Sequence, residues 1–139
     1  MTENESTCSC DCGSDCGENC VTNDAPTSAY ACAGASNVGV ISFDLTKALH
    51  LANRYKMGCS VCAGAGDCGC GGTVTPDGKK DLLIDGCKVG CLKKMFENKG
   101  ITDFNHVIVT QLGVKKEGKF DYDKSIINKL LAKLTEKGL

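Results

Sequence analysis

The chain has 139 residues, a net charge of −1 and 12 cysteines. It contains no run of about 18 apolar residues, which excludes a membrane-spanning helix and a membrane partner. Residues 1–19 are acidic and polar, so they do not form a secretory signal peptide. We therefore expect a cytoplasmic protein, in which dense cysteines serve metal binding or catalysis more often than disulfide cross-linking.

Charge divides the chain into two parts. Residues 1–27 carry six acidic side chains, no Lys or Arg, and almost no apolar residue besides cysteine. Residues 28–139 carry the other 11 acidic and all 16 basic side chains. The sequence predicts an acidic, Cys-rich tail over 1–27, disordered unless a metal orders it, and one domain over 28–139. The lysines are dispersed and Arg54 is the single arginine, so nucleic acid is not an expected partner.

The first half of the domain alternates short strands with a helix. Residues 28–32 form a strand candidate, and residues 34–39 form a turn of small residues. From residue 40 to 55 apolar positions recur at helical spacing, with Ser36 or Asn37 expected as the N-cap. Residues 55–59 are predicted to form a second short strand, for which the sequence pattern is weak. The Gly-rich stretch 62–78 contains Pro-Asp-Gly and is expected to be a loop.

The second half has clearer signals. Residues 81–85 (Asp-Leu-Leu-Ile-Asp) predict a buried strand, and residues 91–98 a helix that stops at Gly100. Residues 106–111 predict a fourth strand. Asp123 or Ser125 is expected to cap a final helix with one apolar stripe.

This order of elements predicts a small three-layer α/β domain with a mainly parallel four-stranded sheet. Right-handed crossovers place every strand-to-helix loop at the carboxyl edge of such a sheet, where ligands bind in open α/β folds. Thiols gathered there from several strand ends indicate a metal or redox centre. The predicted core ligands follow the strands directly and are Cys32, Cys59, Cys62, Cys87 and Cys91.

The motif with the most specific chemistry is Asp85-Gly86-Cys87-x₃-Cys91. Gly86 permits a tight exit from the strand, and Gly90 lets the backbone approach a ligand. Both cysteines lie at the start of the predicted helix, where unpaired N–H groups and the helix dipole favour the thiolate, the form that binds metal. Four thiolates at about 2.3 Å from Zn²⁺ make a closed structural site, so we expect zinc.

Cys59-Ser-Val-Cys62 is a CxxC pair, which is typical of both zinc knuckles and thioredoxin-type redox pairs. A redox pair usually lies at the start of a helix. Because the small residues 63–66 are a poor start for a helix, the sequence favours metal ligation by this pair.

A second metal site is predicted in the tail. Its cysteine spacing matches neither ferredoxin-type pattern, whereas closely spaced soft thiolates suit Zn²⁺ or Cu(I). The candidate ligands are Cys8, Cys10, Cys12, Cys16 and Cys20. Cys68-Gly-Cys70 has a similar spacing and could join either site.

Four segments resemble the DGC family, which is named for an Asp-Gly-Cys motif. They are Cys32-Ala-Gly-Ala-Ser-Asn-Val-Gly39, Lys56-Met-Gly-Cys59, Ile84-Asp-Gly-Cys87-x₃-Cys91 and His106-Val-Ile-Val-Thr-Gln-Leu-Gly-Val-Lys-Lys116. The resemblance covers residues 28–120 and leaves the tail outside. It implies a small α/β domain with four recurring cysteines that hold zinc. In this chain they are Cys32, either Cys59 or Cys62, Cys87 and Cys91.

Three functions follow from these patterns. The leading hypothesis is a non-catalytic protein that binds zinc, and that buffers or delivers it. The alternative is an iron–sulfur or thiol redox protein, because thiols at one sheet edge also bind a cluster. The third is an enzyme with Cys32, Cys87 or Cys91 as nucleophile. Neither His50 nor His106 accompanies a cysteine in a motif, so the sequence favours a protein that is not an enzyme.

Overall fold

The structure is a computed structural model that describes residues 23–65 and 71–139. In these ranges no helix is both long and apolar enough to cross a membrane. The elements in chain order are β1 (Ser28–Ala31), α1 (Asn37–Leu51), β2 (Lys56–Met57), α2 (Ser60–Ala65), β3 (Leu82–Asp85), α3 (Cys91–Asn98), β4 (Asn105–Ile108), the 3₁₀ helix η2 (Val109–Leu112) and α4 (Ser125–Glu136).

The four strands form one parallel sheet in the order β2-β1-β3-β4. Tyr30 of β1 lies opposite Leu83 of β3, and Ile84 of β3 lies opposite Val107 of β4. Because all strands run in the same direction, they all end at one edge. The exits of β1, β2 and β3 each lead toward a helix. The predicted α/β fold with a parallel four-stranded sheet is confirmed.

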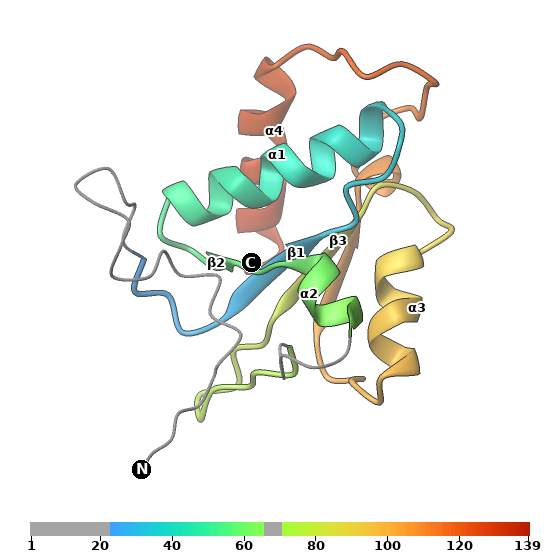
Figure 1. The fold of residues 1–139 in the computed structure, drawn as a ribbon. Helices are drawn as coiled ribbons and strands as arrows, with labels where there is room; N and C mark the ends of the chain where they lie inside the picture. Colours follow the sequence, from blue (N-terminus) through green and yellow to red (C-terminus); the bar gives the residue numbers. More distant parts are fainter. Residues whose placement is uncertain (1–22, 66–70) are drawn as a thin grey trace, which may run out of the picture.

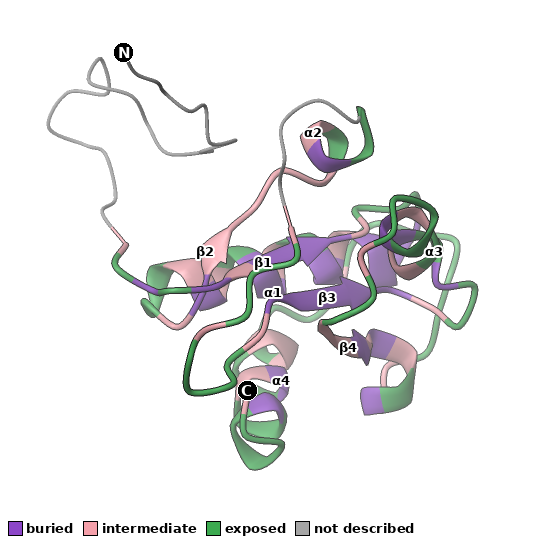
Figure 2. Ribbon diagram, turned by 90° about the horizontal axis from the view of Figure 1, so that it is seen from below, coloured by how far each residue is buried: buried purple, intermediate pink, exposed green. Residues whose placement is uncertain are grey.

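Helices cover both faces of the sheet (Figure 1). α1 and α4 cover one face, over a core that includes the strand residues Leu82 and Ile84. α2 and α3 cover the other face, over a second core around Tyr30 and Leu83. The central strands β1 and β3 are therefore buried from both sides, as Figure 2 shows. The two cores hold the strand ends, and with them the functional loops, in place.

Two elements differ from the prediction. Residues 60–65 form helix α2, although the loop was expected to begin at residue 62. The prediction was wrong because these small residues pack on the domain: Ala63 is buried in the second core, and Gly64 lies against the Met95 side chain of α3. The fourth strand ends at Ile108, not at residue 111, because the chain turns there into η2.

Residues 23–27, which precede β1, pack on the domain. The Asn23 side chain donates hydrogen bonds to the carbonyls of His50 and Tyr55, at 2.8 and 2.9 Å. Thr27 is buried. These contacts join the start of β1 to the turn between α1 and β2.

Asp81 lies immediately before β3 and is fully buried. Its two carboxylate oxygens accept hydrogen bonds from Ser28 N–H at 2.8 Å and Thr73 N–H at 3.1 Å. Burial raises the pKa of this carboxyl above its ordinary value, and the backbone hydrogen bonds offset part of that rise. Asp81 thus fastens the amino-terminal edge of the sheet, opposite the edge that carries the cysteines.

Candidate functional site

Cys32 directly follows β1, and its backbone still pairs with the sheet, because its N–H donates to the Ile84 carbonyl at 3.0 Å. The sulfur accepts a hydrogen bond from Gly86 N–H at 3.2 Å and lies 3.4 Å from Ser42 Oγ of α1. Ser42 in turn donates to the Gly39 carbonyl at 2.7 Å. The half-buried thiol is therefore held between the exits of β1 and β3.

The exit of β3 passes very close to the first turn of α1. A Cβ on Gly86 would lie 2.9 Å from the carbonyl carbon of Val38 and 3.1 Å from Gly39 N. These are backbone atoms that cannot move aside, so only glycine fits. The close approach brings Gly86 N–H to the sulfur of Cys32.

Cys87 and Cys91 flank the short turn from β3 to α3. Cys91 is the first residue of α3 and is exposed, and it follows Gly90, whose φ of 66° is left-handed. The half-buried Cys87 has its sulfur 3.5 Å from Lys116 Nζ. Lys116 lies in the loop between η2 and α4, and its place beside Cys87 was not predicted from the sequence.

One pocket of about 230 Å³ brings these groups together between the exits of β1 and β3. Cys32, Cys87 and Cys91 line it, with Asp85 and Lys116. Three soft sulfur donors beside a cation can bind a soft metal ion, and Lys116 offsets negative charge on the thiolates. We call this the Cys32 pocket.

Asp85 supports the Cys32 pocket by holding the first turn of α3 against the end of the sheet. Its carboxylate is buried and accepts hydrogen bonds from Leu92 N–H at 2.9 Å and Lys93 N–H at 3.2 Å, in the first turn of α3. The same carboxylate lies 2.8 Å from His106 Nε2 of β4. Asp85 is therefore the cap of α3, and it ties the helix that begins with Cys91 to the sheet. The strand-end position of Asp85 was the only sequence signal for this role, and the partner His106 had none.

Cys59 and Cys62 lie elsewhere, at the exit of β2. Cys59 lines a second pocket of about 480 Å³, together with residues of α1 and the exit of β1. Neither Cys59 nor Cys62 lines the Cys32 pocket. The structure thus divides the five predicted core ligands into a group of three and a pair. It also places the pair at the start of a helix, which removes the reason for favouring metal ligation over redox chemistry there.

Within residues 23–65 and 71–139, no three Cys, His, Asp or Glu side chains are gathered closely enough to hold a metal ion as they stand. The predicted tail ligands Cys8, Cys10, Cys12, Cys16 and Cys20 lie outside the described residues, and so do Cys68 and Cys70. The tail site remains a prediction.

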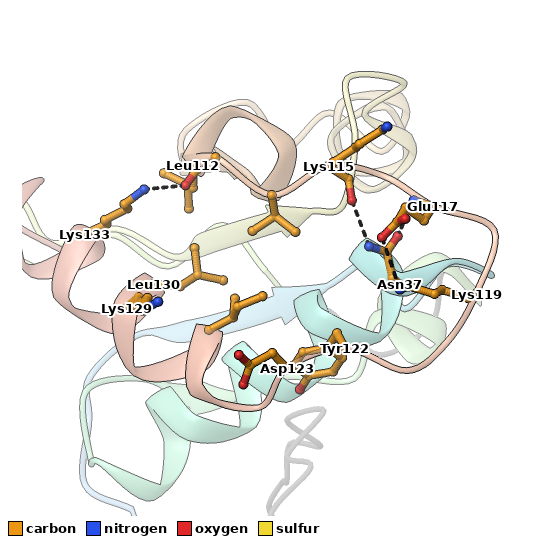
Figure 3. Close-up of a pocket in the computed structure, with 13 residues that line it drawn as sticks. Asn37, Leu112, Lys115, Glu117, Lys119, Tyr122, Asp123, Lys129, Leu130 and Lys133 are labelled. Atoms are coloured by element: carbon orange, nitrogen blue, oxygen red, sulfur yellow. Dashed lines mark hydrogen bonds and ion pairs between the residues drawn. The ribbon is translucent and has the colours of Figure 1, made fainter.

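A third pocket, of about 360 Å³, lies between the start of α1, the loop before α4, and α4 itself (Figure 3). Asn37 fastens that loop, because its side chain donates to the Lys115 carbonyl at 2.8 Å and accepts from Glu117 N–H at 2.6 Å. Lys133 Nζ donates a hydrogen bond to the Leu112 carbonyl at 2.5 Å. The side chain of Asn37 thereby sets the position of Lys116 beside Cys87. The N-cap of α1 is Ser36, as predicted.

Comparison with known proteins agrees with this arrangement. A family model for the DGC domain matches residues 28–134. The chain is similar to the anaerobic and virulence modulator AnvM of Pseudomonas aeruginosa, with 29% identity over 111 residues that cover 76% of this chain and 79% of the relative. No solved structure matches the chain. The family match includes the whole sheet and every residue of the Cys32 pocket, and the chain belongs to the DGC domain family.

Proposed function

We propose that the protein binds a metal ion, zinc, through thiolates of the Cys32 pocket, and that Cys32, Cys87 and Cys91 are the ligands. The observation that carries the proposal is the meeting of these three cysteines, from the exits of two adjacent parallel strands, around one small pocket. Sulfur ligands select Zn²⁺ and other soft metal ions over Mg²⁺ or Ca²⁺.

The surroundings of the three sulfurs fit a metal–thiolate site. The Gly86 N–H already donates to the Cys32 sulfur, and such a bond stabilises a negatively charged sulfur. Three thiolates around Zn²⁺ carry one net negative charge, which the ammonium group of Lys116 at 3.5 Å from Cys87 balances. Cys87 and Cys91 flank a turn at the surface and are half-buried and exposed, so their side chains have room to rotate toward a common ion.

Three protein ligands leave one position of a tetrahedral metal ion open. An open position lets the ion pass to another ligand, which suits buffering or delivery of metal more than a permanent structural role. A cytoplasmic location is part of the proposal, because a reducing compartment keeps these thiols available. The similar protein AnvM is named an anaerobic and virulence modulator, and oxygen-free conditions favour reduced thiols.

The test is metal analysis of protein purified without oxygen, compared among single Cys→Ser variants. We expect Cys32→Ser, Cys87→Ser and Cys91→Ser each to lower the zinc content by about one ion per chain. Cys59→Ser and Cys62→Ser are matched controls outside the pocket, and they should keep the content of the parent protein. If the Cys87 variant keeps its metal, or if the control variants lose theirs, the assignment of ligands is wrong.

The same samples distinguish zinc from an iron–sulfur cluster. A colourless anaerobic protein with bound zinc supports the proposal. A visible absorption band that dithionite bleaches, together with stoichiometric iron, would identify a cluster in the same pocket instead.

A further inference from the structure

The Cys59–Cys62 pair has its own local geometry. The Cys59 carbonyl accepts the first helical hydrogen bond of α2, from Ala63 N–H at 3.0 Å. The Cys59 sulfur accepts a second one, from Cys62 N–H at 3.3 Å. Ser60 Oγ donates to the Ala31 carbonyl at 2.6 Å and fastens this turn to the end of β1. The pair is therefore held at a fixed place beside the sheet.

This spacing brings the two sulfurs within reach of each other. Cys59 immediately precedes α2 and Cys62 lies in the first turn of that helix, so the two side chains are three positions apart in one turn of the chain. A disulfide spans Cα separations of about 4.4–6.8 Å. The Cys59 sulfur already lies 3.3 Å from the backbone nitrogen of Cys62, so the two thiols belong to the same turn, and a disulfide requires their Cβ atoms to lie about 3.5–4.5 Å apart.

An open apolar pocket lies beside Cys59. Its volume of about 480 Å³ is that of a small-molecule site. Phe43 and Val61 line it, with 44% and 82% of their surface exposed, and together they give the pocket an apolar wall that solvent can reach. Lys47 and His50 of α1 supply its polar edge, and the lining contains no Asp or Glu. Lys47 is held only loosely by Asp44, at 3.9 Å.

We propose that Cys59 and Cys62 are a dithiol–disulfide couple, and that the pocket beside them binds a small, apolar, anionic disulfide that the couple reduces. Cys59 is the attacking thiol, because it lines the pocket and Cys62 does not. Cys62 is the resolving thiol. This redox site is separate from the metal site proposed above and does not depend on it.

The proposed reaction is a two-step thiol–disulfide exchange that needs only the cysteine pair and the ligand disulfide. The Cys59 thiolate attacks one sulfur of the ligand disulfide, so that a mixed disulfide forms and one ligand thiolate leaves. The Cys62 thiolate then attacks the Cys59 sulfur, the Cys59–Cys62 bond forms, and the second ligand thiolate leaves. Two electrons pass from the dithiol to the ligand, and the two protons of the cysteines end on the two released thiols. A low-molecular-weight dithiol regenerates the pair by the reverse exchange.

The first experiment locates the disulfide. Fully reduced protein is mixed anaerobically with one equivalent of 5,5′-dithiobis(2-nitrobenzoate), an aromatic dianionic disulfide, and the remaining thiols are alkylated for peptide mapping. We expect a Cys59–Cys62 disulfide in most molecules. In Cys62→Ser the label should stay on Cys59 as a mixed disulfide. Serine is a good N-cap residue, so Cys59→Ser keeps the helix start and serves as the inactive variant. Oxidation mainly at other cysteines would overturn the proposal.

The second experiment tests the pocket. Phe43→Ala should slow release of thionitrobenzoate by about fivefold, because it removes apolar contact with the ring. Phe120→Ala is the matched control, since Phe120 is 62% exposed and lies outside the pocket. Reaction with cystamine, a small cationic disulfide, should be equal in the two variants. Equal rates with the aromatic probe, or faster reduction of a protein disulfide such as that of insulin, would exclude the small-ligand pocket.

The two proposals fail separately. Loss of the redox reaction in Cys59→Ser with unchanged zinc supports a second, independent site. If Cys59→Ser instead removes zinc and the reaction together, Cys59 belongs to the metal site and the redox proposal is wrong.

Discussion

At the carboxyl end of β3, the carboxylate of Asp85 joins three elements. It accepts two N–H groups of α3 and pairs with His106 of β4, while its own backbone remains in the sheet. Hydrogen bonds to a charged group are stronger than neutral ones, and a buried donor left without a partner costs its full desolvation energy. Asp85 thus acts on the Cys32 pocket by positioning Cys91.

Replacement of Asp85 by Asn should lower the free energy of unfolding by about 1–3 kcal/mol. One of the two oxygens that accept hydrogen bonds from the first turn of α3 is then replaced by an NH₂ group, which cannot accept. Urea denaturation measures this change. Asp103→Asn is the control: Asp103 pairs with Lys80 at 2.6 Å, but both side chains are exposed, so the change should stay below about 1 kcal/mol. Equal effects of the two substitutions would contradict the role of Asp85.

Asp81 makes stability depend on pH. Because burial raises its pKa in the folded state, the folded protein holds this proton more strongly than the unfolded chain does. The contribution of Asp81 to stability is therefore greatest below the ordinary pKa of 3.8 and declines as the pH rises from there through the folded-state value.

The variant Asp81→Asn does not titrate, so the comparison isolates this group. Asn loses one acceptor for the N–H groups of Ser28 and Thr73, which lowers stability by a constant amount at every pH. The free energy of unfolding of the variant minus that of the parent should increase as the pH is raised from about 4 toward neutrality, because only the parent loses the contribution of protonated Asp81. Urea denaturation across this range gives the difference, and a decrease would show that the sign is wrong.

At the scale of elements, the site depends on how closely β3 and α1 approach. The exit of β3 contacts the first turn of α1 through Gly86, and this contact presents an N–H to the sulfur of Cys32. On the face of the sheet that α2 and α3 cover, the small residues of α2 likewise let this helix lie against α3. Glycines at close contacts therefore shape both cysteine groups: Gly86 lies against the backbone of α1, and Gly64 lies against the Met95 side chain of α3.

Gly86→Ala should destabilise the protein by about 1–3 kcal/mol, because the added methyl group meets the backbone of Val38. It should also lower metal retention if the Cys32 pocket holds zinc. Gly118→Ala adds a methyl group with nothing within 4 Å and is expected to be neutral or slightly stabilising. Thermal denaturation and metal analysis of both variants check these outcomes. A Gly86→Ala variant as stable as the parent protein would contradict the packing argument.

At the scale of the whole molecule, the domain and the tail carry separate predictions. The described residues 23–27 are joined to the domain by Asn23 and Thr27, so a deletion that tests the tail should end at residue 22. Residues 1–22 contain five cysteines and five acidic residues, with almost no other apolar residue, so they have little apolar area to bury.

Deletion of residues 1–22 should leave the melting temperature of the domain nearly unchanged. The metal content should fall by about one ion, since four thiolates complete one zinc site and five cysteines cannot complete two. Differential scanning calorimetry and metal analysis measure the two effects. A large loss of stability on deletion would show that the tail packs on the domain and lends a ligand to the core.

Local sequence patterns were enough to predict most of the fold. The apolar run at 81–85 and the helical pattern at 91–98 identified β3 and α3, because burial and periodicity are properties of neighbouring residues. The same patterns predicted the parallel sheet, and from it the edge at which strand exits meet. The Asp-Gly-Cys motif pointed to Cys87 and Cys91, and the strand exits and the family resemblance added Cys32 and either Cys59 or Cys62 to the same group.

Only the tertiary structure decided how the cysteines divide. Strand order says which exits are adjacent, but the direction of each thiol depends on contacts between distant segments. Cys32 turns toward Gly86, Cys87 lies beside Lys116 of a distant loop, and Cys59 faces a separate pocket beyond β1. Helix α2 likewise packs on the second core through Ala63, whereas the sequence alone shows glycines that disfavour a helix. Periodicity is encoded locally, while close packing is decided by the neighbours that the fold brings together.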